Sequence, residues 1–244
     1  MDRELKDCAR VLKGCRNVAV LTGAGISAES GVHTFRGKGG LWEKHDAEDL
    51  ATIEGFKRDP KAFWEWFDER RQEIAKARPN AAHLALAEME RSFDSFSVIT
   101  QNIDGLHRLA KSTLIIELHG NVWRVKCTRD REASENRDVP LGEIPPLCYC
   151  GAVLRPDVVL FGESLDPVNI DRAYLLSETC NAMLVVGTSA VVYPAAQLPL
   201  IAKRVGAIVV EVNHETTPLT QMCDFSFRES AAKVLPDLVK LLSQ

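Results

Sequence analysis

The stretch of sequence that decides the fold is Val18-Ala-Val-Leu-Thr22, followed directly by Gly23-Ala-Gly-Ile-Ser-Ala28. Its first residues form a short, continuous apolar run, which is typical of a strand buried on both faces of a parallel sheet. The glycines allow the backbone to turn sharply and approach a pyrophosphate, and the helix expected after them offers free N–H groups. This pattern predicts a dinucleotide-binding turn, although a glycine turn without a ligand gives the same pattern.

Working outward, apolar runs alternate with helical patterns along the chain. Runs of the same kind lie at 96–100, 114–118, 182–187 and 207–212. Helical periodicity is expected over 3–13, 80–91, 168–180, 195–204 and 230–242. Alternation of strand and helix predicts an α/β fold with a doubly wound parallel sheet.

Two stretches interrupt this alternation and are interpreted as insertions. Residues 37–78 are rich in charge and tryptophan, and residues 123–157 carry three close cysteines and several prolines. We therefore expect the sheet domain to comprise 1–36, 79–122 and 158–244, with the two insertions forming a smaller domain.

The composition excludes several classes of protein. The 244 residues carry 30 basic and 34 acidic side chains, a formal net charge of −4, so no nucleic-acid partner is indicated. No apolar stretch is long enough to span a membrane, and the charged first ten residues lack the apolar core of a secretory signal. The odd count of seven cysteines indicates a reducing compartment, so we expect a cytoplasmic location. Nothing in the sequence indicates the oligomeric state.

Polar side chains follow each of the predicted strands, at the edge where open α/β sheets bind ligands. They are Gln101-Asn-Ile-Asp-Gly-Leu-His107, His119-Gly-Asn121, Gly187-Thr-Ser189 and Asn213-His-Glu215. Asp104 would alternatively cap the next helix, and His119 would alternatively be structural. A neutral imidazole at His119 could act as a general base near pH 7.

A dehydrogenase of the Rossmann type is not supported. Such an enzyme carries an acidic residue about 20 positions after the glycine turn, at the end of a second strand. Here the residues that follow, 30–40, form a polar, glycine-rich segment without a strand pattern.

Taken together, the motifs resemble the sirtuins, the NAD-dependent protein-lysine deacylases, most closely the bacterial and archaeal members. The motifs occur in the family's order as GAGISAESG (23–31), TFRG (34–37), TQNIDGLH (100–107), HGN (119–121), LRPDVVLFGE (154–163), GTS (187–189) and VNHE (212–215). The resemblance implies a Rossmann-like NAD-binding domain and a small domain with a helical module at 37–78 and a zinc-ribbon-like module at 123–157.

The resemblance also implies a cofactor site. Gly23, Ala24, Gly25 and Ser27 would hold the pyrophosphate, and Phe35, Arg36 and Trp42 would belong to the loop beside the nicotinamide ribose. Asn102, Ile103 and Asp104 would line the nicotinamide pocket, with Gln101 near the ribose. Gly187, Thr188, Ser189, Asn213 and Glu215 would hold the adenosine side, with Ala231 near the adenine.

The implied reaction removes an acyl group from lysine and yields nicotinamide and an O-acyl-ADP-ribose. His119 would be the general base, aided by Asn102 and Asp104, and Val159, Phe161 and Gly162 would border the acyl-lysine tunnel. The implied partners are acylated-lysine proteins, whose backbone would pair as a strand beside this segment. The alternatives are mono-ADP-ribosyl transfer to protein and a non-catalytic sensor of NAD or ADP-ribose.

Two departures from the family pattern concern metal and acyl group. The family has two C-x-x-C pairs binding structural zinc, whereas this chain has Cys127, then Asp130 at the second position, and Cys148 and Cys150 one residue too close. Either Asp130 or water would complete a zinc site, or the site is degenerate. Members that prefer succinyl- or malonyl-lysine carry a Tyr and an Arg three residues apart, which here are Phe67 and Arg70. We expect activity on acetyl-lysine and on negatively charged acyl-lysines.

Overall fold

The computed structural model describes residues 2–33 and 50–244. A six-stranded parallel sheet forms the larger part, in the order β3-β2-β1-β7-β8-β9. Its strands are β1 (Asn17–Thr22), β2 (Ser95–Thr100), β3 (Ile115–Glu117), β7 (Ala182–Val186), β8 (Ile208–Val212) and β9 (Phe225–Phe227). The α/β, Rossmann-like fold class is thereby confirmed.

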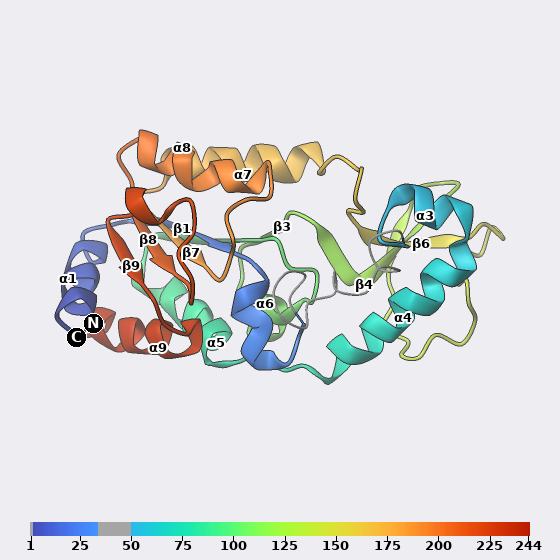
Figure 1. The fold of residues 1–244 in the computed structure, drawn as a ribbon, viewed down its shortest axis with the longest axis horizontal. Helices are drawn as coiled ribbons and strands as arrows, with labels where there is room; N and C mark the ends of the chain where they lie inside the picture. The colour runs from blue at the N-terminus through green and yellow to red at the C-terminus, as the bar shows by residue number, and fades with distance from the viewer. Residues whose placement is uncertain (1, 34–49) are drawn as a thin grey trace.

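Helices cover both faces of this sheet because alternate strand residues are apolar on each side. α1 (Asp2–Leu12), α5 (Ala81–Met89) and α9 (Ala231–Leu242) pack on the face that carries Val20 and Leu184. α7 (Pro167–Thr179) and α8 (Leu198–Arg204) pack on the face that carries Leu21 and Val185. Figure 1 shows these two helical layers, with both termini at the end of the sheet that lies away from the smaller part. No helix of the described residues is long and apolar enough to cross a membrane.

The smaller part has its own antiparallel sheet, in the order β5-β4-β6. It contains β4 (Gly120–Cys127), β5 (Ala133–Glu135) and β6 (Leu154–Val158), with α3 (Ile53–Arg58) and α4 (Pro60–Lys76) packed against them. The core between them is aromatic: Phe63, Trp64 and Phe67 of α4 make ring contacts with one another. Trp123 of β4 belongs to the same core.

Shorter elements complete the chain: η1 (Ala24–Ser30), η3 (Glu90–Ser92), α6 (Leu106–Leu109), η4 (Ala195–Gln197) and η5 (Thr220–Met222). The helix expected at the glycine turn is η1, which begins after Gly23 and is a 3₁₀ helix. Gly25 donates its N–H outside the element, to the carbonyl of Gly187 at 2.8 Å, and Gly31 ends the segment with a left-handed backbone.

Candidate functional site

The polar clusters lie next to one another at the carboxyl edge of the parallel sheet. Sheet order places His119 just beyond β3, Gln101–Asp104 after β2, and Gly23–Ser27 after β1. Gly187–Ser189 follow β7 and Asn213–Glu215 follow β8. Because neighbouring parallel strands end at one edge, residues far apart in sequence converge there.

The two glycine turns pack backbone to backbone. A Cβ atom at Gly23 would lie 2.7 Å from Cβ of Thr188, and one at Gly25 would lie 2.8 Å from Cα of Gly187. Gly187 itself has a φ of +59°, and a Cβ there would lie 2.4 Å from the backbone nitrogen of Ile26. Only glycine permits so close an approach, which brings the start of η1 against the end of β7.

Ser27, Asn102 and Asp104 form one buried hydrogen-bond network. The Ser27 hydroxyl donates to Oδ2 of Asp104 at 2.8 Å, and Nδ2 of Asn102 donates to the Gly23 carbonyl at 3.0 Å and to Ser27 Oγ at 3.2 Å. Asp104 also accepts from the N–H of Leu106, the first residue of α6, at 2.8 Å, although the N-cap of that helix is Gly105. Burial raises the pKa of the Asp104 carboxyl, against the opposing effect of these two hydrogen bonds.

Two buried histidines lie next to this network. His107 belongs to the polar cluster predicted from the sequence, whereas His83 was missed. His83 and His107 are buried with ring centroids 4.9 Å apart, and His107 Nε2 lies 3.0 Å from the Thr22 hydroxyl. Burial lowers the pKa of His83 to about 4, and burial together with His83 lowers that of His107 to about 3. Both rings are therefore neutral at pH 7. His83 lies inside α5, and nothing in the neighbouring sequence predicts that it is buried against His107.

His119 has the geometry of a neutral general base. Its Nδ1 lies 2.8 Å from the carbonyl oxygen of Gln101, which can only accept, so Nδ1 carries the proton and Nε2 keeps its lone pair. Burial lowers the pKa of His119 and outweighs the opposing effect of that hydrogen bond. The His119 ring is thus kept in its neutral form, and the Gln101 carbonyl fixes its orientation.

Hydrogen bonds link the remaining clusters across the sheet edge. Gln101 Nε2 donates to the Thr188 hydroxyl at 2.9 Å, and Asn213 Nδ2 donates to the Thr188 carbonyl at 3.0 Å. Ser189 and Glu215 are exposed beside them, and Ala231 begins α9. Phe35, Arg36 and Trp42 lie outside the described residues.

The comparisons with known proteins agree with this arrangement. The family model described as "Sir2 family" matches residues 23–194, which contain the glycine turn, Asn102, Asp104 and His119. The chain belongs to the Sir2 family. The NAD-dependent protein deacylase of Aquifex aeolicus is 53% identical over 229 residues, which are 93% of this chain and 96% of that one. The NAD-dependent protein deacylase 1 of Caldanaerobacter subterraneus subsp. tengcongensis is 52% identical over 88% of this chain and 89% of its own.

Solved Sir2 structures share the whole fold. A Sir2 homologue in complex with ADP-ribose superposes with a TM-score of 0.93 at 42% identity, covering 97% of this chain and 96% of that one. A Sir2 protein in complex with a p53 peptide and NAD⁺ gives a TM-score of 0.87 at 35% identity, covering 97% of both chains.

In this Sir2-family chain, residues 158–163 connect the small antiparallel sheet to His119. The Val159 N–H donates to the His119 carbonyl at 2.9 Å, and Phe161 pairs with 51–53 through its N–H and carbonyl. Arg155 clamps Glu163 with two hydrogen bonds of 2.6 Å, and Glu163 accepts from the Leu160 N–H. The segment is held at both ends, while the Phe161 side chain is 52% exposed.

Phe67 and Arg70 lie one helical turn apart on α4 of the Sir2-family small domain. Phe67 is 3% exposed and stacks on Phe63. The Arg70 side chain is 15% exposed, and its Nη1 lies 3.0 Å from Glu73. Its Nε is buried without a hydrogen-bond partner among the described residues. Arg70 is therefore a largely buried cation with unused donor capacity.

The structure brings Asp130 together with the three close cysteines. The ligand atoms of Cys127, Asp130, Cys148 and Cys150 all lie within 4.8 Å of one another. The Cys127 and Cys150 sulfurs are 3.6 Å apart, close to the roughly 3.8 Å edge expected for tetrahedral zinc with Zn–S bonds of about 2.3 Å. Thiolate and carboxylate are both established zinc ligands, so the donor set fits that ion.

Proposed function

We propose that this chain is an NAD-dependent protein-lysine deacylase, which transfers the acyl group of a modified lysine to ADP-ribose. The observation that carries the proposal is His119, held as a neutral base by the Gln101 carbonyl and adjacent to the Asn102–Asp104 cluster. Membership of the Sir2 family, and curated relatives named NAD-dependent protein deacylase, support it.

The proposed NAD site spans the carboxyl edge of the sheet. The glycine turn and Ser27 would hold the pyrophosphate, because a turn without Cβ atoms lets the backbone approach it closely. Asn102, Ile103 and Asp104 would line the nicotinamide pocket and Gln101 would lie near its ribose. The adenosine side would contact Gly187, Thr188, Ser189, Asn213, Glu215 and Ala231.

The chain's own residues supply position, a base and exclusion of water. NAD contributes the nicotinamide leaving group and the ribose that receives the acyl group. His119 would take a proton at Nε2 from a ribose hydroxyl, since Nδ1 is committed to Gln101. The Ser27–Asn102–Asp104 network is already ordered by its own hydrogen bonds. It would therefore hold the nicotinamide end with little further loss of side-chain entropy on binding.

The protein substrate would bind along residues 158–163. We propose that Val159, Phe161 and Gly162 border the acyl-lysine tunnel and that the substrate backbone pairs as a strand between this segment and the one near Val192. Backbone hydrogen bonds from Val159 to His119, and between Phe161 and residues 51–53, support this. They fix the position of the tunnel wall relative to His119. A structural relative carries a p53 peptide together with NAD⁺.

We also propose that the acyl range includes succinyl and malonyl groups, with Arg70 binding the distal carboxylate. The buried, unpartnered Nε of Arg70 supports this, because a carboxylate would satisfy it with a charge-assisted hydrogen bond. Phe67 fills the position where members that prefer succinyl- or malonyl-lysine have Tyr. It contributes no hydroxyl, so one hydrogen bond of about 1 kcal/mol is absent.

For the zinc-ribbon-like module we propose that Cys127, Cys148 and Cys150 bind structural zinc with Asp130 as the fourth ligand. The convergence of these four donors supports it. The ion would tie the end of β4 to the 148–150 turn and would take no part in the acyl transfer.

One experiment separates the proposed function from its rivals. The protein is incubated with NAD and an acetylated peptide, and the peptide is analysed by mass spectrometry. Deacylated peptide supports the proposal, whereas peptide that gains ADP-ribose supports the transferase. An unchanged peptide with NAD binding retained would support the sensor, and either of the last two results would refute the deacylase.

A further inference from the structure

A charged carboxylate lies inside the sheet beside the proposed adenosine site. Glu211 of β8 is 1% exposed. It is oriented toward the loop after β8, where its carboxylate accepts hydrogen bonds from Thr217, from Thr220 at 2.8 Å and from Ser226 at 2.9 Å. A fourth hydrogen bond comes from Arg228 at 2.9 Å. So many donors are needed because a buried carboxylate is tolerated only when it is paired and hydrogen-bonded.

Arg228 connects this carboxylate to the backbone of the same loop. Its Nη2 donates to Glu211 and also to the Thr220 hydroxyl at 2.7 Å, and its Nη1 donates to the Glu215 carbonyl at 3.0 Å. The guanidinium thus bridges a buried side chain and a main-chain oxygen through its rigid fork. Burial raises the pKa of Glu211, but the hydrogen bonds from Thr217, Thr220, Arg228 and Ser226 outweigh it and leave the pKa lowered.

The loop held in this way continues into the proposed NAD site. The Asn213 N–H donates to the Phe227 carbonyl at 3.1 Å, which ties the start of the loop to the end of β9. The Asn213 side chain donates to the Thr188 carbonyl, and the Thr188 hydroxyl accepts from Gln101. The Glu211–Arg228 pair therefore holds the loop that follows Asn213, and it does so directly at the Glu215 carbonyl.

We propose that Glu211 and Arg228 are positioning residues for NAD, which hold Asn213 and Glu215 in the conformation that receives the adenosine ribose. The proposal rests on the function proposed above, since it assumes that NAD binds at this edge. Both residues act through the loop at 213–217, which they contact at the Glu215 carbonyl and the Thr217 hydroxyl. Without the Glu211–Arg228 pair, the loop would have to be ordered each time NAD binds, and affinity would fall.

The test uses Arg228→Gln and Arg228→Lys in the full chain, with Lys203→Gln as the matched control. Lys203 forms an ion pair with Asp224, which accepts from the N–H of Val209 in the same strand, but this pair lies at the opposite end of β8. The measurements are the Kd of ADP-ribose by calorimetry, the KM for NAD, and kcat at saturating NAD. Circular dichroism confirms that each variant is folded.

We expect Arg228→Gln to raise both the Kd of ADP-ribose and the KM for NAD about 10-fold, as ordering a few loop residues would. The kcat should stay within about 2-fold of the wild type, because the base and nicotinamide pocket are untouched. Arg228→Lys should recover part of the affinity, and Lys203→Gln should change nothing. Unchanged ADP-ribose affinity in Arg228→Gln, or a fall in kcat without a change in KM, would overturn the proposal. If the wild-type protein does not bind ADP-ribose at all, the proposed function itself has failed.

Should Arg228→Gln fold poorly, Glu211→Gln provides the second variant. It keeps the shape of the side chain and most of its hydrogen bonds but removes the charge that attracts Arg228. We expect the same direction of change in Kd and KM, and no change in either would count against the positioning role.

Discussion

At the scale of single residues, His119 is the proposed general base, and its environment predicts how the activity depends on pH. Burial lowers its pKa below that of a free histidine, so the base is unprotonated at pH 7. We expect kcat/KM to be constant near neutrality and to fall as the pH drops through the lowered pKa, below about 6.5.

The variant His119→Asn should lose at least about 100-fold in kcat, the lower end of the contribution of a general base. Its ADP-ribose affinity should stay near that of the wild type. The pH profile of kcat/KM and a binding titration check both statements, and full activity of His119→Asn would show that another group is the base.

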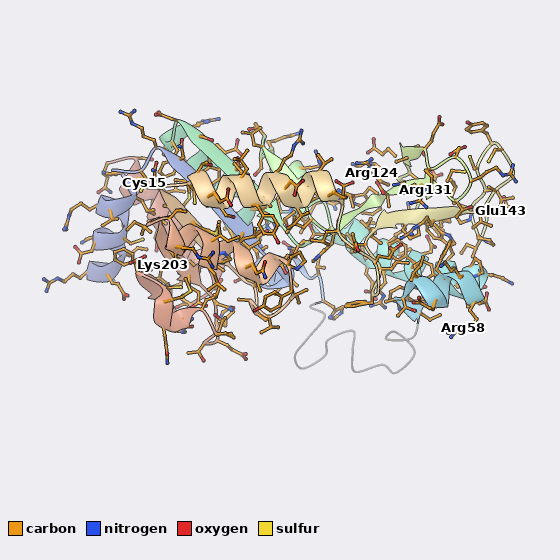
Figure 2. The ribbon with its side chains drawn as sticks, turned by 90° about the horizontal axis from the view of Figure 1, so that it is seen from above. Cys15, Arg58, Arg124, Arg131, Glu143 and Lys203 are labelled. Carbon is orange, nitrogen blue, oxygen red and sulfur yellow. The ribbon has the colours of Figure 1, made fainter. Side chains whose placement is uncertain are left out.

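Arg70 is the residue on which the proposed acyl range depends. Arg70→Ala should lower kcat/KM for a succinylated peptide about 10-fold or more while changing that for the acetylated peptide much less, because only the former has a distal carboxylate. Arg58→Ala is the control, an exposed arginine of the same small domain (Figure 2). Equal losses on both peptides would contradict carboxylate recognition.

Gly120 links the base to the small domain and tolerates no side chain. It has a φ of +80°, and a Cβ there would lie 2.1 Å from the Asp157 carbonyl oxygen. We expect Gly120→Ala to lower the free energy of unfolding by about 2–5 kcal/mol, from backbone strain and overpacking together.

Gly151→Ala isolates the backbone contribution, because its φ is +78° and no atom lies within 4 Å of the added Cβ. It should lower the free energy of unfolding by only about 1–2 kcal/mol. Urea titrations of both variants measure the difference, and equal losses would show that the Asp157 contact is irrelevant.

At the scale of elements, the sequence predicted the parallel sheet well because its strands are buried on both faces. The predicted apolar run at 18–21 lies within β1, and the run at 182–187 covers β7 and one residue more. The strands of the small sheet could not be predicted in the same way. β5 is exposed along its whole length, and β4 and β6 have mixed patterns, so long-range pairing rather than local sequence defines them.

The site could be predicted in part for the same reason. Polar residues at strand ends were visible as breaks in apolar runs, so Gln101–Asp104 and His119 were identified from sequence. His83 and the Glu211–Arg228 pair were not. His83 lies inside a helix, and Glu211 lies inside an apolar strand where only the folded loop reveals its partners.

The turn carrying Asp130 gives the prediction at this scale. Removing zinc with a chelator should increase hydrogen exchange in the β4–β5 turn and in the 148–150 turn, because the ion would hold these two turns together. The six-stranded sheet should stay protected. Asp130→Ala should lose zinc at a lower chelator concentration than the wild type, and Glu132→Ala, which removes a neighbouring carboxylate, should not. Identical zinc retention in all three proteins would exclude Asp130 as a ligand.

At the scale of the whole molecule, the paired histidines make stability depend on pH. His83 and His107 titrate near pH 4 and 3 in the folded protein, whereas in the unfolded chain they titrate near 6.5. Between pH 6.5 and 4 the unfolded chain binds more protons, so their contribution is fully present above pH 6.5 and is lost as the pH falls.

Each histidine should lower the free energy of unfolding by up to about 1.4 kcal/mol per pH unit across this window. Urea titrations at pH 7, 6 and 5 measure the slope. His107→Gln should fold with a shallower dependence, because one titrating group is gone; an unchanged slope would mean that His107 is accessible to protons in the folded state.

The two sheets are joined next to the proposed active site. The large sheet presents His119 and the proposed NAD site, and the small sheet is joined to them through Gly120, at the start of β4, and through residues 158–163. The acyl-lysine would therefore bind between the large sheet and the small sheet, which have separate hydrophobic cores. This explains why His119 lies where the two sheets are joined and not deep in either core.

The most direct test of deacylation by transfer to ADP-ribose is the stoichiometry of a single reaction with NAD and an acetylated peptide. Nicotinamide, deacetylated peptide and O-acetyl-ADP-ribose are quantified together by mass spectrometry over time. We predict equal amounts of all three at every time point and no deacetylation without NAD. Release of free acetate without nicotinamide, or of nicotinamide without the acetylated ADP-ribose, would contradict the central claim.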